Sequence, residues 1–251
     1  MIFSYPLLAL ASFIAGIIMT LAGGGVFVTF PALLLTGLDP RAANITATIG
    51  IYASQLNNSF SGRHMASGTG HLSFNNLMII SLIGGIIGAI LLLLTPQTFF
   101  AKLVPWLVLL ATITFAWGSF HRRPIEEKEP HDRLGKTGAI VVQSLIAIYG
   151  GYFGGGMGLM MLSALTWAGM RFQPAAHTKN ILGTIINTSA VGVFLLSTDI
   201  HWAKVGIMTI GSILGGLVGL RLLHKVNERY LRIAIVAIGL MLTVGLFLRA
   251  K

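Results

Sequence analysis

The sequence predicts an all-α integral membrane protein, on the evidence of its composition, its long apolar runs and an internal repeat. The chain has 251 residues, of which 55% are hydrophobic and only 10% are charged, whereas soluble domains carry about 25% charged residues. Several apolar runs reach the roughly 20 residues that a helix needs to cross a bilayer. Because these runs are continuous instead of alternating, helices are favoured over a membrane barrel.

About eight hydrophobic helical segments are expected. They cover residues 5–38, 42–61, 74–95, 103–120, 138–168, 175–197, 203–223 and 230–248. The first has no basic residue before it and no clear cleavage site, so it is interpreted as a span and not as a signal peptide. The one long hydrophilic stretch holds four of the seven acidic residues. The chain thus divides into a first transmembrane repeat (1–120), a hydrophilic linker (121–137) and a second transmembrane repeat (138–251).

The first and fifth segments are each more than 30 residues long, and each contains a glycine triplet. Glycine leaves helical geometry at a low steric cost. Each segment is therefore expected to consist of two half-helices that meet at an unwound turn, either as a discontinuous span or as a re-entrant hairpin. The triplets are Gly23, Gly24 and Gly25 in the first segment and Gly154, Gly155 and Gly156 in the fifth.

The two halves share a pattern beyond the triplets, which predicts a repeat of four segments. Two further motifs recur in the same order, at offsets of 133 and 127 residues, close to the 131 of the triplets. Repeated halves with a broken helix at corresponding positions point to the binding site of a transporter. The recurring motifs are Ala42-Ala43-Asn44 with Ala175-Ala176-His177, and Ile83-Gly84 followed by Gly88 with Ile210-Gly211 followed by Gly215.

The distribution of Lys and Arg favours inverted repeats. If all eight segments crossed the membrane, its two sides would hold nine and eight Lys and Arg residues. If the first and fifth segments are re-entrant, the two sides hold five and twelve, and the halves are inverted. Cytoplasmic loops are enriched in Lys and Arg, so the second arrangement is favoured and the linker is expected in the cytoplasm.

The candidate binding groups are the six triplet glycines and the polar residues of segments 42–61 and 175–197. Unwound turns and the helix N-termini after them attract anions, although glycines also serve close helix packing, as we expect for Gly84-Gly85 and Gly215-Gly216. Polar side chains within a membrane line a pathway or bond neighbouring helices, and both readings stay open. The polar candidates are Asn44, Thr46, Thr48, Gln55, His177, Thr178, Lys179, Asn180 and Asn187.

The charges of the apolar segments favour an anionic solute. No Asp or Glu lies inside any of these segments, which argues against a metal-cation site. Lys179 is the main cation near the expected path, unless it is a boundary residue that extends to the headgroups. The chain has no Cys, so thiolate metal sites and Cys nucleophiles are excluded. No catalytic residue, cofactor or metal site is expected. No nucleic-acid surface is expected either, because the Lys and Arg residues behind the net charge of +10 lie mostly between apolar runs.

Two stretches resemble the paired signatures of the TauE/SafE sulfite-exporter family. They are LAGGGVFVTFPALLLTGLDPRAANITAT in the first half and YGGYFGGGMGLMMLSALTWAGMRFQPAAHTKN in the second. The resemblance covers essentially the whole chain. It implies a secondary carrier of the bacterial inner membrane for sulfur-containing anions such as sulfite, sulfoacetate and related organosulfonates. The second half departs from the first at Leu162, which matches Pro31, and at Lys179, which matches Thr46.

The sequence thus predicts a transporter that binds a small anion between two rocking halves within the lipid bilayer. A passive anion channel is the alternative within this class, and an intramembrane enzyme or a structural subunit is the alternative from another class. The exact substrate, the direction of transport, a coupling ion (proton or sodium) and a homodimer stay open at this point.

Overall fold

The computed structural model describes residues 4–21, 25–60, 63–120, 133–222 and 228–249, and every regular element in these ranges is a helix. The all-α prediction is confirmed. Most of the predicted linker, residues 121–132, lies outside the described residues. The first half contains α1 (Ser4–Leu21), α2 (Val26–Leu35), α3 (Pro40–Phe60), the 3-10 helix η1 (Arg63–Met65), α4 (Phe74–Leu94) and α5 (Gln97–Phe120). The second half contains α6 (Gly135–Tyr152), α7 (Met157–Trp167), α8 (Phe172–Phe194), α9 (Trp202–Leu222) and α10 (Glu228–Arg249).

Within the described ranges, three helices are long and apolar enough to cross a membrane by themselves. They span Phe74–Leu94, Gln97–Trp117 and Trp202–Leu222. Their outer faces carry large apolar side chains, such as Leu94, Trp117 and Ile210, each more than 60% exposed. Water would make such a surface unfavourable, whereas lipid tails are as apolar as these side chains. The chain is therefore an integral membrane protein.

The inner faces of α4 and α9 are glycine faces that touch other helices at backbone distance. A methyl group on Gly88 would overlap the carbonyl oxygen of Ile148 in α6, and one on Gly215 would overlap that of Phe13 in α1. Small residues of this kind let membrane helices approach closely. The packing role predicted for the Gly84-Gly85 and Gly215-Gly216 pairs is confirmed, since every one of these glycines has a neighbouring helix within 3 Å of its Cβ position.

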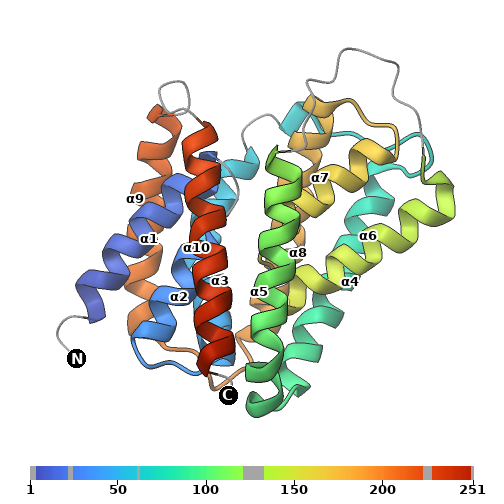
Figure 1. The fold of residues 1–251 in the computed structure, drawn as a ribbon. Coiled ribbons are helices and arrows are strands. Elements are labelled where there is room, and N and C mark those ends of the chain that lie inside the picture. The colour runs from blue at the N-terminus through green and yellow to red at the C-terminus, as the bar shows by residue number, and fades with distance from the viewer. Residues whose placement is uncertain (1–3, 22–24, 61–62, 121–132, 223–227, 250–251) are drawn as a thin grey trace.

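The chain reverses direction between α1 and α2 and again between α6 and α7 (Figure 1). A Cβ on Gly25, just before α2, would lie 3.0 Å from the carbonyl oxygen of Ala15 in α1, so α2 turns back against the helix that precedes it. Between α6 and α7, Gly154 has φ +79° and Gly156 has φ +73°, backbone angles that favour glycine. Gly23 and Gly24 lie outside the described residues.

The molecule has two faces, one at each end of its helices, and we name each face after the segment that lies there. At the N-terminal face, the lower end in Figure 1, α1 begins and α10 ends; at the linker face, the upper end, α5 ends and α6 begins. The α4–α5 turn and the α8–α9 loop lie at the N-terminal face, and α3 is joined to α4 at the linker face.

Several helices start before the expected segment bounds, and α5 and α8 are two examples. α5 begins at Gln97, six residues before segment 103–120, so Lys102 lies in the helix and not in a loop. α8 begins at Phe172 instead of residue 175 and includes Pro174 in its first turn. Both differences arise because polar and proline residues suit the first turn of a helix, where N–H groups have no partner within the helix. Hydropathy therefore marks the apolar part of each helix and misses its polar start.

Candidate functional site

The start of α7 has backbone N–H groups without a partner among the described residues. Gly156 is the N-cap residue in the left-handed conformation and offers no side-chain cap. Its carbonyl accepts from Leu159 and Met160. Within the described ranges, the backbone N–H groups of Gly155, Gly156 and Gly158 donate to no acceptor of the protein. The first N–H groups of a helix carry a partial positive charge and lack internal partners.

A half-buried tyrosine fixes the direction of one of these donors. The hydroxyl of Tyr149 donates to the carbonyl oxygen of Gly155 at 2.7 Å. The C=O and N–H groups of one planar trans peptide point in opposite directions. The N–H of Gly156, which belongs to the same peptide, therefore points away from Tyr149. The glycine turn is thus held in one orientation by a side chain of α6.

Lys179 brings a full positive charge to the same place. A Cβ on Gly158, in the first turn of α7, would lie 3.8 Å from Nζ and 4.0 Å from Cδ of Lys179. The ammonium group and the N-terminus of α7 are both positive, so they attract an anion more strongly together than either does alone.

Asn44 approaches the same break from α3. Its Nδ2 donates to the carbonyl oxygen of Tyr152, the last residue of α6, at 3.0 Å. Its Oδ1 has no partner in the described part of the protein, and neither has Oγ1 of Thr46, although both residues are at most 1% exposed. Buried polar atoms of this kind are uncommon in folded proteins and mark places where water or a ligand binds. Thr48 donates to the carbonyl oxygen of Asn44 within α3.

The remaining polar residues of α3 and α8 form a seam, by which we mean the antiparallel contact of these two helices. The seam joins Tyr52 to Thr188, with 2.7 Å between the hydroxyl oxygens, and Asn187 to Gln55, whose Oε1 accepts from Nδ2. The hydroxyls of Ser59 and Thr184 also pair, and Ser59 donates to the carbonyl oxygen of Asn180. In this conformation the two polar stripes satisfy each other across the interface between the halves.

Two predicted residues lie apart from the glycine turn. Thr178 is fully buried at the linker face, where its Oγ1 accepts from the N–H of Ser67 at 3.0 Å and donates to its carbonyl at 3.2 Å. His177 is half-buried, and its Nδ1 has no partner in the described part of the chain. In the first half, Gly25 has the ordinary helical φ of −57° and accepts hydrogen bonds from Val28 and Thr29.

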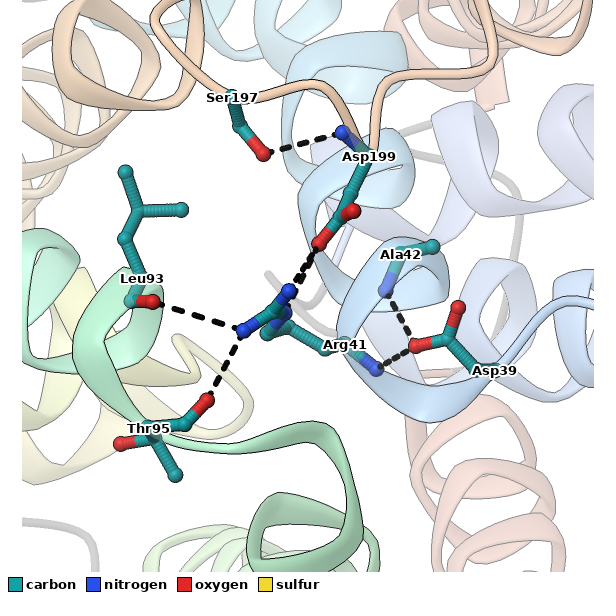
Figure 2. Close-up of polar contacts among 7 residues, drawn as sticks. All are labelled: Asp39, Arg41, Ala42, Leu93, Thr95, Ser197 and Asp199. Atoms are coloured by element: carbon teal, nitrogen blue, oxygen red, sulfur yellow. Dashed lines mark hydrogen bonds and ion pairs between the residues drawn. The ribbon is translucent and has the colours of Figure 1, made fainter.

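One polar cluster was not expected from the sequence. Figure 2 shows Arg41, at the start of α3, bound to Asp199 in the α8–α9 loop. Its Nε and Nη2 each lie 2.8 Å from Oδ2 of Asp199. Its Nη1 donates to the carbonyl oxygens of Thr95 at 3.0 Å and Leu93 at 3.4 Å, at the end of α4. Asp39 and Asp199 stand out in the sequence as acidic residues at segment ends, but nothing there pairs either of them with Arg41.

Comparison with known protein families identifies the family of this chain. The family model for the sulfite exporter TauE/SafE matches residues 8–247. The chain belongs to the TauE/SafE family. The relatives of this TauE/SafE chain include a probable membrane transporter protein of Haemophilus influenzae, 28% identical over 92% of this chain and 89% of the relative. Others are the probable membrane transporter proteins ORF9 of Sinorhizobium sp., 30% identical over 95% and 90%, and YfcA of Escherichia coli K12, 26% identical over 93% and 86%.

Membership also indicates the general activity of the protein. This TauE/SafE chain is a membrane transporter. The family recognised from the glycine signatures is confirmed by a match over nearly the whole chain.

Proposed function

We propose that this TauE/SafE protein is a secondary carrier of the bacterial inner membrane that moves small sulfur-containing anions by alternating access. Sulfite, sulfoacetate and related organosulfonates are the proposed substrates. The observation that carries the proposal is the start of α7. There the N–H groups of Gly155, Gly156 and Gly158 have no partner among the described residues, and the ammonium group of Lys179 lies beside Gly158 in the first turn. Sulfite and sulfonate groups present several acceptor oxygens and a negative charge, which match these donors.

Inverted halves support the alternating-access part of the proposal. The contact of α1 with α9 corresponds to that of α6 with α4. In the same way, the contact of α3 with α9 corresponds to that of α8 with α4, and the contact of α2 with α10 to that of α7 with α5. Exchanging α1–α5 with α6–α10 turns each contact into its counterpart. The α1–α2 hairpin starts from the N-terminal face and the α6–α7 hairpin from the linker face (Figure 1). Carriers with this symmetry rock one repeat against the other around a central site.

The seam favours a carrier over the alternative of a passive channel. A channel needs a continuous open path, whereas the polar residues of α3 and α8 are bonded to one another at three positions along the interface. An anion passes such a seam only when the halves separate at one end and then at the other. Transport by this route saturates with substrate and shows counterflow.

Counterflow in proteoliposomes tests the function. Vesicles loaded with unlabelled sulfite or sulfoacetate are expected to accumulate the labelled anion transiently, and an empty vesicle or a channel gives no such overshoot. Lys179→Gln is expected to raise the half-saturating anion concentration about tenfold, because a charge-assisted hydrogen bond is lost.

The matched control is Arg171→Gln, which removes a positive charge from the exposed residue before α8. Its counterflow should equal that of the unchanged protein. Equal half-saturation in Lys179→Gln would reject the anion site at α7, and absence of counterflow with every anion tested would reject the carrier itself.

A further inference from the structure

The seam between α3 and α8 ends in two loop contacts, one at each face. At the N-terminal face, Asp199 in the loop after α8 binds Arg41 at the start of α3. At the linker face, Ser67 in the loop after α3 binds Thr178 near the start of α8. The helices α3 and α8 are the third helices of their halves, and each contact joins the loop after one of them to the other helix. The two contacts are therefore counterparts under exchange of the halves.

These contacts lie about one bilayer core apart. α3 has 21 residues, with Arg41 in its first turn and the loop that holds Ser67 after its end. A helix rises about 1.5 Å per residue, or roughly 30 Å in total. The hydrocarbon core of a bilayer has the same thickness. The two contacts thus lie at opposite ends of the seam.

The two contacts differ in strength. Arg41 uses all three of its nitrogens, on one carboxylate and two carbonyls, and both members of the ion pair are less than a fifth exposed. Thr178 makes two neutral hydrogen bonds to one backbone residue. Charge-assisted hydrogen bonds are about twice as strong as neutral ones. Lys204 adds a further link at the N-terminal face, where its Nζ donates to Oγ1 of Thr36 at 2.8 Å.

We propose that Arg41 with Asp199, and Thr178 with Ser67, are the two gates of the transport cycle, and that their unequal strength biases the protein toward opening at the linker face. The inference rests on the proposed carrier function. Asp199 and Thr178 act as positioning residues that hold the halves together and do not touch the substrate. Weakening a gate shifts the population toward the state that is open on that side.

The absence of Cys in the chain allows a direct test by chemical labelling. Thr184→Cys places one reactive thiol within the seam, beside Ser59. A membrane-impermeant methanethiosulfonate reagent is added to the N-terminal face in one arm and to the linker face in the other. With no second change, the thiol is expected to react faster from the linker face.

Gate variants are then added to this reporter. Asp199→Asn is expected to raise the labelling rate from the N-terminal face about tenfold, and Thr178→Val to raise the rate from the linker face by a smaller factor of about five. Asp39→Asn is the matched control. It removes the same charge at the same face, but within the described residues the hydrogen bonds of the Asp39 carboxylate are to the N–H groups of Arg41 and Ala42, in its own helix start. Its labelling rates should stay unchanged.

Each result decides the proposal. An unchanged N-terminal rate in both Asp199→Asn and Arg41→Gln overturns the charged gate, and the second variant covers the case in which the first does not fold. Faster labelling from the N-terminal face in the reporter alone overturns the bias. Labelling needs no substrate, so it tests the gates independently of transport. If the labelling rates change as expected but no anion shows counterflow, the gates are supported and only the proposed function is rejected.

Discussion

Gly156 shows how one residue determines the geometry of the candidate site. Its φ of +73° turns the chain from α6 into α7, where the N–H groups of Gly155, Gly156 and Gly158 have no partner among the described residues. A Cβ at this position would lie 3.0 Å from the carbonyl oxygen of Ala111 and 3.1 Å from Oγ1 of Thr114. Both the backbone angle and the space around it therefore require glycine.

Gly156→Ala is expected to destabilise the protein by about 1–2 kcal/mol, because other residues adopt the left-handed conformation at that cost. Thermal unfolding of the purified protein in detergent measures the effect. Gly192→Ala in α8 is the control, since nothing lies within 4 Å of its Cβ position and alanine favours a helix over glycine. Equal transition temperatures for both variants would show that the turn at Gly156 is not strained by a side chain.

For single residues, the sequence predicts which ones have an unusual structural role but not which residues they contact. Glycine triplets in over-long apolar segments predict a break in each segment, because few other residues leave a helix at low cost. The ion pair of Arg41 with Asp199 could not be predicted, since its members are 158 residues apart and each also reads as an ordinary helix-end residue. Gln55 and Asn187 were predicted to share a path, whereas their mutual hydrogen bond depends on the register of two distant helices.

Among the elements, the glycine faces of α4 and α9 decide how the hairpins dock. α6 lies on α4 and α1 lies on α9 without room for a methyl group at several positions. Periodic small residues predict such contacts in membranes, so this part of the fold follows from the sequence. The identity of the partner helix does not, because any close-packed helix satisfies the same pattern.

Gly215→Ala and Gly206→Ala compare two positions on α9. The first methyl group would overlap the carbonyl oxygen of Phe13, and the second has nothing within 4 Å. Gly215→Ala is expected to destabilise the protein by about 1–3 kcal/mol through overpacking, and Gly206→Ala to leave it unchanged or slightly more stable. Unfolding in detergent, followed by tryptophan fluorescence, distinguishes the two. A loss confined to Gly206→Ala would contradict the docking of α1 on α9.

For the molecule as a whole, the charge distribution predicts which loops share a side of the membrane. Re-entrant first and fifth segments put the α3–α4 loop and the α8–α9 loop on opposite sides, whereas eight full crossings put them on the same side. The reversal of the chain before α2 and after α6 agrees with the first arrangement. The chain has no Cys, so single Cys substitutions can distinguish the two arrangements.

Gly70→Cys and His201→Cys place these thiols in the two loops, at exposed positions. An impermeant maleimide added to intact cells should label His201→Cys and leave Gly70→Cys unlabelled until the membrane is opened with detergent, because the linker face, with twelve Lys and Arg residues, is expected in the cytoplasm. Labelling of both loops from one side would contradict the inverted arrangement. Labelling of Gly70→Cys alone would reverse the orientation and keep the inversion.

The docking of α1 on α9 also constrains how the protein is made. α1 leaves the ribosome long before the helix that receives it, Trp202–Leu222. Contacts so distant in sequence form slowly, since a long intervening chain must first be brought together. The hairpin of α1 and α2 therefore stays in the bilayer with its docking surface open to lipid until α9 has been made. A truncated chain that stops before α9 leaves this hairpin open to aggregation and proteolytic quality control.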